Sequence, residues 1–226
     1  MSMTCAVSAR GPHRLLRNRG GQIMAKHIFD KTIAALVLMI MAVPMLLIAA
    51  AILILMGRPI LFRQTRPGFQ AVPFTMVKFR TMRVPGPDRS STDSDPANDG
   101  PRLTRLGRFL RATSLDELPG LWNVVRGEMS LVGPRPLLME YLPLYSPRQA
   151  RRHLVRPGVT GWAQVNGRNA ITWAQKFELD IWYVEHQSFA LDCRILALTV
   201  KKVLWRDGIA AAGAPTMPKF TGRGAQ

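Results

Sequence analysis

The sequence predicts a mostly helical α+β protein, in which a broken apolar helix precedes one compact domain with a small β-hairpin. Three observations support this fold class. Residues 32–57 form an uncharged run, residues 60–80 alternate short apolar segments around a Pro-Gly pair, and the chain from residue 101 onward has mostly helical periodicity. The 226 residues are enough for one sizeable domain.

The charge balance is strongly basic, with 31 Lys and Arg residues against 14 Asp and Glu residues and a net charge of +17. Such a surface requires an anionic partner, which can be nucleic acid, anionic lipid or a phosphorylated substrate. The two cysteines, Cys5 and Cys193, show no paired spacing, and the four histidines are scattered. This pattern argues against a disulfide framework and against a zinc site.

The N-terminal part divides into a basic tail over residues 1–25, predicted to be disordered, and an apolar membrane helix over residues 26–58. Pro44 lies near the centre of the uncharged run and is expected to break the helix. Each arm is then ~18–20 Å long at ~1.5 Å per residue, which is too short to cross a hydrocarbon core of ~30 Å.

Basic residues flank this run at both ends, with Lys26 and Lys31 before it and Arg58, Arg63 and Arg66 after it. The positive-inside rule therefore keeps both ends in the cytoplasm. Together with the central proline, this charge pattern predicts a re-entrant membrane helix hairpin that enters and leaves the same leaflet. The alternative is a single proline-kinked spanning helix.

The cytoplasmic domain is assigned to residues 59–226. It begins with short strands at 60–65 and 72–80, joined by a Pro-Gly turn at 67–68. Residues 84–101 are rich in Pro, Gly, Ser and Asp, and this composition predicts a mobile loop.

Two amphipathic helices are expected later in the chain. Between residues 102 and 113, Leu103, Leu106 and Leu110 share one face and arginines occupy the other. This pattern is typical of an interfacial helix on an anionic membrane, and a solvated basic face fits it equally well. Residues 172–187 place aromatic and apolar side chains at helical spacing, which fits either a core helix or an interfacial belt.

The stretch "SLDELPGLWN" carries an adjacent acidic pair, Asp116 and Glu117, in an otherwise basic chain. Ser114 and Glu117 have the spacing of a capping box, so the pair can be structural. The alternative is that the two carboxylates do the chemistry of the protein.

The surrounding residues favour chemistry. Arg108 and Arg111 lie just upstream of the acidic pair, and "VGPRP" presents Arg135 from a rigid loop downstream. Guanidinium groups beside a helix N-terminus make a phosphate site, in which a carboxylate can ligate Mg²⁺ or attack phosphorus. Three further glycines are placed where the backbone can approach a ligand: Gly158, Gly161 and Gly167. Their spacing matches neither a Walker loop nor a dinucleotide fingerprint.

Three long motifs resemble the bacterial sugar transferases, the monotopic phosphoglycosyl transferases, in their small minimal-core form. They are "KFRTM" (78–82), "TSLDELPGLWNVVRGEMSLVGPRP" (113–136) and "RPGVTGWAQVNGRN" (156–169). The resemblance runs from about Lys26 to Asp207, in the order and spacing of the family.

This resemblance implies the transfer of a sugar 1-phosphate from a UDP-sugar to undecaprenyl phosphate, with release of UMP and with Mg²⁺, at the cytoplasmic face of the bacterial inner membrane. By position, Asp116 matches the nucleophile that forms a covalent phosphosugar intermediate, and Glu117 matches its partner in metal binding or proton handling. The resemblance also implies roles for Arg135 with its neighbours Pro134 and Pro136 at the nucleotide, for Lys78 and Arg111 near the phosphates, and for Pro44 at the helix break.

Several points stay open at this level. Asp180 and Asp192 are further candidates for metal or sugar contact, against ordinary pairing with Lys176 or Arg194. A one-step transfer in which Asp116 only ligates metal is one alternative, and a membrane-anchored protein that binds nucleic acid is another. The C-terminal half is most similar to members that use UDP-N,N′-diacetylbacillosamine or related N-acetylated amino sugars, while glucose and galactose donors stay possible. Oligomerisation is also possible.

Overall fold

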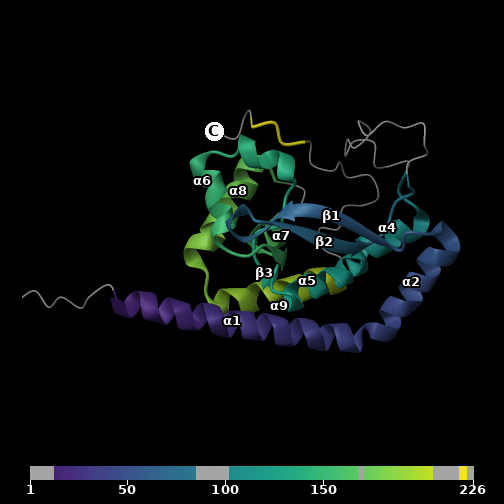
Figure 1. Ribbon diagram of the computed structural model, residues 1–226, viewed down its shortest axis with the longest axis horizontal. Coiled ribbons are helices and arrows are strands. Elements are labelled where there is room, and N and C mark those ends of the chain that lie inside the picture. The colour runs from purple at the N-terminus through teal and green to yellow at the C-terminus, as the bar shows by residue number, and fades with distance from the viewer. Residues whose placement is uncertain (1–12, 85–101, 168–170, 206–218, 223–226) are drawn as a thin grey trace, which may run out of the picture.

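The computed structural model describes residues 13–84, 102–167, 171–205 and 219–222. Helix α1 (His13–Ile40) lies along the base of the molecule, and helix α2 (Ala42–Met56) turns away from its end (Figure 1). The helix begins inside the stretch 1–25 that the sequence assigned to a tail. The loop predicted at 84–101 lies outside the described residues apart from its first position.

The break between the two helices lies at Met41, three positions before Pro44. Proline has no backbone N–H, so the carbonyl of Ile40 cannot receive the usual bond from position 44. The bonds from Met41 to Val37 and from Met45 to Met41 persist on either side. The chain therefore bends, and Pro44 itself sits in the first turn of α2, where a missing N–H is tolerated.

Taken together, residues Ile23–Ile40 and Ala42–Met56 form an apolar pair bent by 62°. No single helix of the described chain is long and apolar enough to cross a membrane, whereas the bent pair meets these two criteria of length and composition only when its helices are taken together. Its side chains are widely exposed, with Ile54 at 80% and Leu46 at 70%. Apolar surface of this extent marks contact with a membrane or a partner.

The predicted hairpin is present as β1 (Leu61–Pro67) and β2 (Pro73–Phe79), which pair antiparallel with Leu61 opposite Phe79. A second sheet was not predicted: β3 (Ser130–Val132) pairs parallel with β4 (Gly158–Thr160). Each of these strands has three residues, so no alternating pattern is long enough to be read from sequence.

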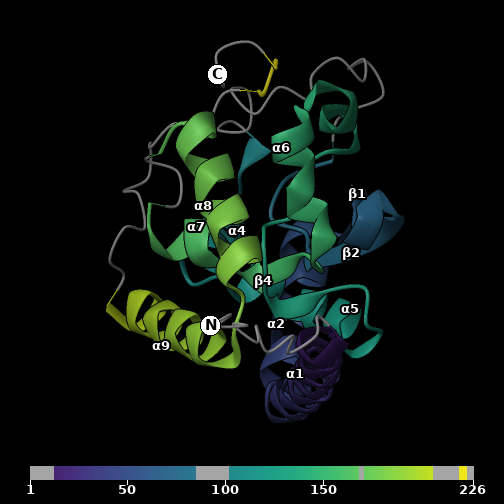
Figure 2. The same ribbon diagram turned by 90° about the vertical axis from the view of Figure 1, so that its left-hand side faces the viewer.

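Helices surround these two sheets. They are α4 (Arg105–Ala112), α5 (Leu121–Val125), α6 (Pro147–Ala150), α7 (Trp162–Val165), α8 (Trp173–His186) and α9 (Phe189–Trp205), with 3-10 helices η1 (Phe69–Ala71), η4 (Leu115–Gly120), η5 (Met139–Leu144) and η6 (Arg151–Leu154). The α1 and α9 helices lie side by side at the base, with α8 above them (Figure 2). The rings of Phe29 and Phe189 join α1 to α9, with 5.0 Å between their centroids.

The apolar face of α4 packs against protein, where the sequence pattern suggested contact with a membrane. Leu110 is fully buried and packs with Ile52 of α2 and Phe79 of β2, and Leu106 packs against the same cluster. Leu103 precedes the helix and forms an isolated bridge with Met82. The leucines therefore belong to the protein core, because α2 and β2 together cover the face that the sequence pattern left without a partner.

The prediction of a helix at residues 172–187 is confirmed by α8. Thr172 and Gln175 form a capping box at its start. Phe177 and Ile181 are each 1% exposed, so this face of the helix belongs to the core.

Candidate active site

The acidic pair lies where three elements meet. The 3-10 helix η4 carries Asp116 and Glu117, β2 carries Lys78, and the loop after β3 carries Arg135. Asn123 of α5, the helix that directly follows η4, binds β2, because its Nδ2 donates to the carbonyl of Thr75 at 2.7 Å and its Oδ1 accepts from a backbone N–H of β2. These bonds satisfy backbone groups at the free edge of β2 and hold α5, and with it the adjoining η4, beside the strand.

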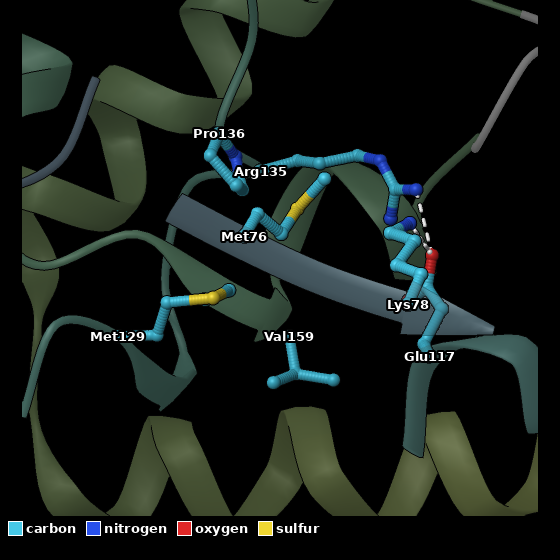
Figure 3. A pocket seen from close by; sticks show the side chains of 8 residues that line it. Met76, Lys78, Glu117, Met129, Arg135, Pro136 and Val159 are labelled. Atoms are coloured by element: carbon cyan, nitrogen blue, oxygen red, sulfur yellow. Dashed lines mark hydrogen bonds and ion pairs between the residues drawn. The ribbon is translucent and has the colours of Figure 1, made fainter. Parts of the chain in front are cut away.

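Glu117 is held by two cations. Lys78 Nζ lies 2.6 Å from Glu117 Oε1, and Arg135 Nη2 lies 2.7 Å from the same oxygen (Figure 3). Burial opposes ionisation of Glu117, but the charges of Arg135 and Lys78 outweigh it and lower the pKa of this carboxyl below its ordinary value. Glu117 is therefore an ionised anchor for both cations.

Asp116 has a different environment. It is 8% exposed, and within the part of the chain that the structure describes no hydrogen bond or ion pair holds its carboxylate. Burial and the neighbouring charge of Glu117 raise the pKa of Asp116, against the opposing charges of Lys78, Arg135 and Arg111. A buried carboxylate with a raised pKa and no direct partner is typical of a reactive group.

The predicted capping box is wrong. Ser114 has φ 58° and ψ 15°, in the left-handed region, and its side chain makes no cap hydrogen bond. The Glu117 side chain cannot return to the helix start, because Lys78 and Arg135 bind it. The acidic pair is positioned by the turn at Ser114 and by these cations.

The cavity beside Glu117 is small and open. Its lining residues are Met76, Lys78, Glu117, Met129, Arg135, Pro136, Gly158 and Val159. Pro134 and Pro136 hold Arg135 from either side, and Pro134 lines a second recess on the other side of this loop. The carbonyl of Pro134 also accepts from the N–H of Gly158 at 3.0 Å.

Arg111 reaches the same region from α4. Its Nε donates to Thr81 Oγ1 at 3.1 Å, and its side chain is exposed. The charge of Arg111 acts on Asp116, so the structure brings the sequence-predicted Lys78, Arg111 and Arg135 together around the acidic pair.

The two lower-ranked aspartates lie in ion pairs. Asp180 is 1% exposed and binds Arg152 at 2.7 Å, and Asp192 is 3% exposed and binds Lys26 at 2.7 Å. Neither aspartate lines the cavity beside Glu117. The charge of Lys176 also acts on Asp180, as the alternative drawn from the sequence expects, while the ion pairs join both aspartates to cations from segments distant in sequence.

Sequence reasoning missed Arg152, which contacts the loop of the candidate site. Its Nη2 donates to the carbonyl of Arg135 at 2.7 Å, so it supports the loop that presents Arg135. The basic run around Arg151 and Arg152 was visible, but only the tertiary fold shows which arginine turns inward.

Close protein contacts require all three glycines, and Gly158 also lines the cavity beside Glu117. A Cβ on Gly158 or Gly161 would collide with the backbone of Gly133, and a Cβ on Gly167 would collide with Ile171. The first two allow the loop after β3 to lie tightly against β4, which positions Arg135.

The site residues fit a magnesium ion that also uses substrate oxygens. The described residues contain no cluster of three or more His, Cys, Asp or Glu side chains that could hold a metal. Asp116 and Glu117 offer at most two carboxylates. This is the donor set that Mg²⁺ uses when substrate phosphates and water complete its shell.

Comparison with known proteins gives a family match over most of the chain. The sequence model of the family described as "Bacterial sugar transferase" matches residues 21–206. An uncharacterized sugar transferase, EpsL of Bacillus subtilis, is 51% identical over 202 residues, which cover 89% of this chain and 98% of that protein.

Two longer relatives carry more specific names. A UDP-glucose:undecaprenyl-phosphate glucose-1-phosphate transferase of Caulobacter vibrioides is 42% identical, over 81% of this chain and 71% of its own length. The protein of the same name from Xanthomonas campestris is 40% identical, over 80% of this chain and 39% of its own length. With a family model that spans most of its length and a relative matched almost from end to end, the chain belongs to the bacterial sugar transferase family and is an enzyme of that class.

Proposed function

We propose that this enzyme transfers a sugar 1-phosphate from a UDP-sugar to undecaprenyl phosphate and releases UMP. The observation that carries the proposal is the unequal acidic pair: Asp116 has a raised pKa and no direct partner among the described residues, whereas Glu117 binds two cations. The names of the Caulobacter and Xanthomonas relatives, which specify a UDP-sugar and undecaprenyl phosphate, support the same reaction class.

In the proposed first step, an Asp116 carboxylate oxygen attacks the phosphorus that bears the sugar. A bond from that oxygen to phosphorus forms, the bond from phosphorus to the UMP oxygen breaks, and UMP leaves with the electron pair. In the second step, a phosphate oxygen of undecaprenyl phosphate attacks the same phosphorus and releases the Asp116 carboxylate. Splitting the transfer lets one site serve a soluble donor and then a lipid acceptor.

The cations offset the negative charge of the donor. Lys78 and Arg135 are already fixed by Glu117, so they can stabilise charge on the leaving UMP without rearranging. Mg²⁺, which we propose is held by Asp116 and Glu117, would supply further positive charge at the donor phosphates. Arg111 approaches from the side of α4 and can bind a phosphate.

The bent apolar pair α1 and α2 is proposed to enter the membrane as a re-entrant hairpin at the cytoplasmic face of the inner membrane. Its exposed apolar side chains and the bend of 62° support this placement. The site would then lie at headgroup level, where the phosphate of the acceptor is found.

The test is intact mass of the purified protein after incubation with a UDP-sugar and Mg²⁺ in the absence of lipid acceptor. We expect a phosphosugar adduct and one equivalent of UMP from the natural protein, and neither from Asp116→Asn. Glu178→Gln is the matched control, because Glu178 is an exposed carboxylate whose partner is the surface residue Arg148. Full turnover by Asp116→Asn would end the proposal.

The donor sugar is best identified by the same UMP assay. The panel should contain UDP-glucose, UDP-galactose and UDP-N-acetylated amino sugars, because the sequence predicts the last class and leaves the other two possible, and the Caulobacter and Xanthomonas relatives are named for glucose. If UMP appears only when acceptor is present and no adduct forms with any donor, the one-step alternative holds.

A further inference from the structure

The motif at the end of β2, "KFRTM", contains a buried arginine to which the proposed mechanism gives no role. Lys78 of this motif binds Glu117. Arg80, two positions later, is 6% exposed, although no carboxylate pairs with it among the described residues. A buried guanidinium needs acceptors for its N–H groups, so its partners reveal what the residue does.

The partners of Arg80 are carbonyls at the C-terminal end of the apolar helix α2 and in the two residues that follow it. Nη2 donates to the carbonyls of Met56 at 2.7 Å and Gly57 at 2.6 Å, and Nη1 donates to that of Arg58 at 3.2 Å. The final carbonyls of a helix lack partners within the helix and carry the negative end of its dipole. One planar guanidinium can donate hydrogen bonds to several carbonyls at once, which a lysine ammonium cannot do equally well.

The next residue, Thr81, connects α4 to the end of β2 by hydrogen bonds. Its carbonyl accepts from the N–H and the hydroxyl of Thr104, which caps α4, and its own hydroxyl accepts from Arg111. A Cβ on Gly107 of α4 would collide with the carbonyl of Thr81. Lys78 in β2 therefore binds Glu117, while Arg80 and Thr81, directly after the strand, bind the end of α2 and the start of α4.

We propose that Arg80 is a positioning residue that fixes the end of α2 at a set distance from the acidic pair, and so sets the height of the site above the lipid surface. The inference rests on the proposed function. The UDP-sugar arrives from water, so the first step depends little on how α2 is seated. The acceptor phosphate is held at headgroup depth, so the second step requires that depth and the position of Asp116 to match.

The test separates the two half-reactions of protein reconstituted in lipid nanodiscs. Adduct formation and UMP release without acceptor report the first step. Transfer from the preformed adduct to undecaprenyl phosphate reports the second. For Arg80→Gln we expect adduct formation within about twofold of the natural protein and transfer slowed by about tenfold or more, because the charged hydrogen bonds to the α2 carbonyls are lost. Arg80→Lys should recover most of the transfer rate.

Arg63→Gln is the matched control, because it removes the same charge from the neighbouring strand β1, where the side chain is exposed. It should leave both steps unchanged. Equal loss of both steps in Arg80→Gln and Arg80→Lys, or no loss in either, would overturn the positioning role. If Arg80→Gln does not fold, the smaller selective loss expected for Arg80→Lys decides the question. Failure of the natural protein to form an adduct would instead count against the proposed function.

Discussion

At the residue scale, two adjacent carboxylates of one short helix are made unequal by their contacts. One carboxylate oxygen of Glu117 forms ion pairs with both Lys78 and Arg135, whereas Asp116 is buried without a direct partner in the described structure. Burial raises the pKa of Asp116, while the two cations lower that of Glu117. The difference assigns distinct tasks to side chains that the sequence presents as a pair.

Replacing Asp116 with Asn is expected to stabilise the fold while it abolishes turnover. Because the pKa of Asp116 is raised above 3.8, its buried charge costs stability once the pH exceeds that value. The free energy of unfolding should rise near neutral pH by about 1 kcal/mol, the usual size for a single stabilising substitution. This gain should vanish in acid, where the carboxyl is protonated in both states. Thermal unfolding at both pH values measures this, and a lower melting temperature at neutral pH would contradict it.

Replacing Glu117 with Gln is expected to have the opposite effect on stability. The folded-state pKa of Glu117 lies below its ordinary 4.5, so its contribution is present above that value and is lost as the pH falls through the folded pKa. The variant leaves Lys78 and Arg135 without their shared anion and should lose roughly 1–3 kcal/mol near neutral pH. Urea titrations across acidic pH provide the measurement. An unchanged midpoint near neutral pH would show that the cations find other partners.

At the element scale, one buried ion pair connects α8 to the residues that support the site. Asp180 of α8 binds Arg152 of η6, and their side chains are 2% and 1% exposed. Arg152 in turn donates to the carbonyl of Arg135. This chain of contacts links a core helix to the loop that presents the active-site arginine.

Asp180→Asn should therefore destabilise the protein by about 3–5 kcal/mol, because it leaves the charge of Arg152 buried and uncompensated. Thermal unfolding measures this loss. The double variant Arg152→Met with Asp180→Leu removes both charges and should regain much of the stability. Its KM for the UDP-sugar should nevertheless stay raised, because Arg135 has lost its support. A normal KM in the double variant would show that Arg152 acts on stability alone.

At the scale of the whole molecule, the apolar pair α1 and α2 underlies a basic domain. One face of α1 is fixed to the domain: Lys26 binds Asp192, and Ser130 Oγ donates to Asp30 at 2.5 Å. The faces of the two helices around the bend stay exposed and apolar. The domain therefore packs against one face of each helix, since α2 also contributes the buried Ile52 to the core.

The proposed re-entrant hairpin predicts that both flanks of the apolar pair lie on the cytoplasmic side. In a variant without Cys5 and Cys193, single cysteines at Gly21 and Arg63 should resist a membrane-impermeant thiol reagent in intact cells and react after permeabilisation. A Cβ at Gly21 meets nothing within 4 Å, so the first substitution is sterically free. Labelling of the Gly21 position alone in intact cells would show that the helix spans the membrane.

Much of the fold was readable because its signals are local. The hairpin strands, the helix at 172–187 and the break near Pro44 each follow from periodicity or from one backbone property within a short window. The parallel pair β3 and β4 was missed because its strands are short and meet across a long stretch of chain. Likewise, the leucines of α4 pointed toward a membrane only because their protein partners lie far away in sequence.

The sequence by itself determined the fold class, the apolar run and the residue types of the site, since composition and local pattern carry these. Only the tertiary structure decided that Glu117 binds Lys78 and Arg135 instead of capping a helix. It likewise decided that Asp180 and Asp192 are buried in ion pairs and that Arg80 holds the end of α2. The physical reason is that a charged side chain takes its role from partners and burial. Both are set by segments that are distant in the chain and become adjacent only on folding.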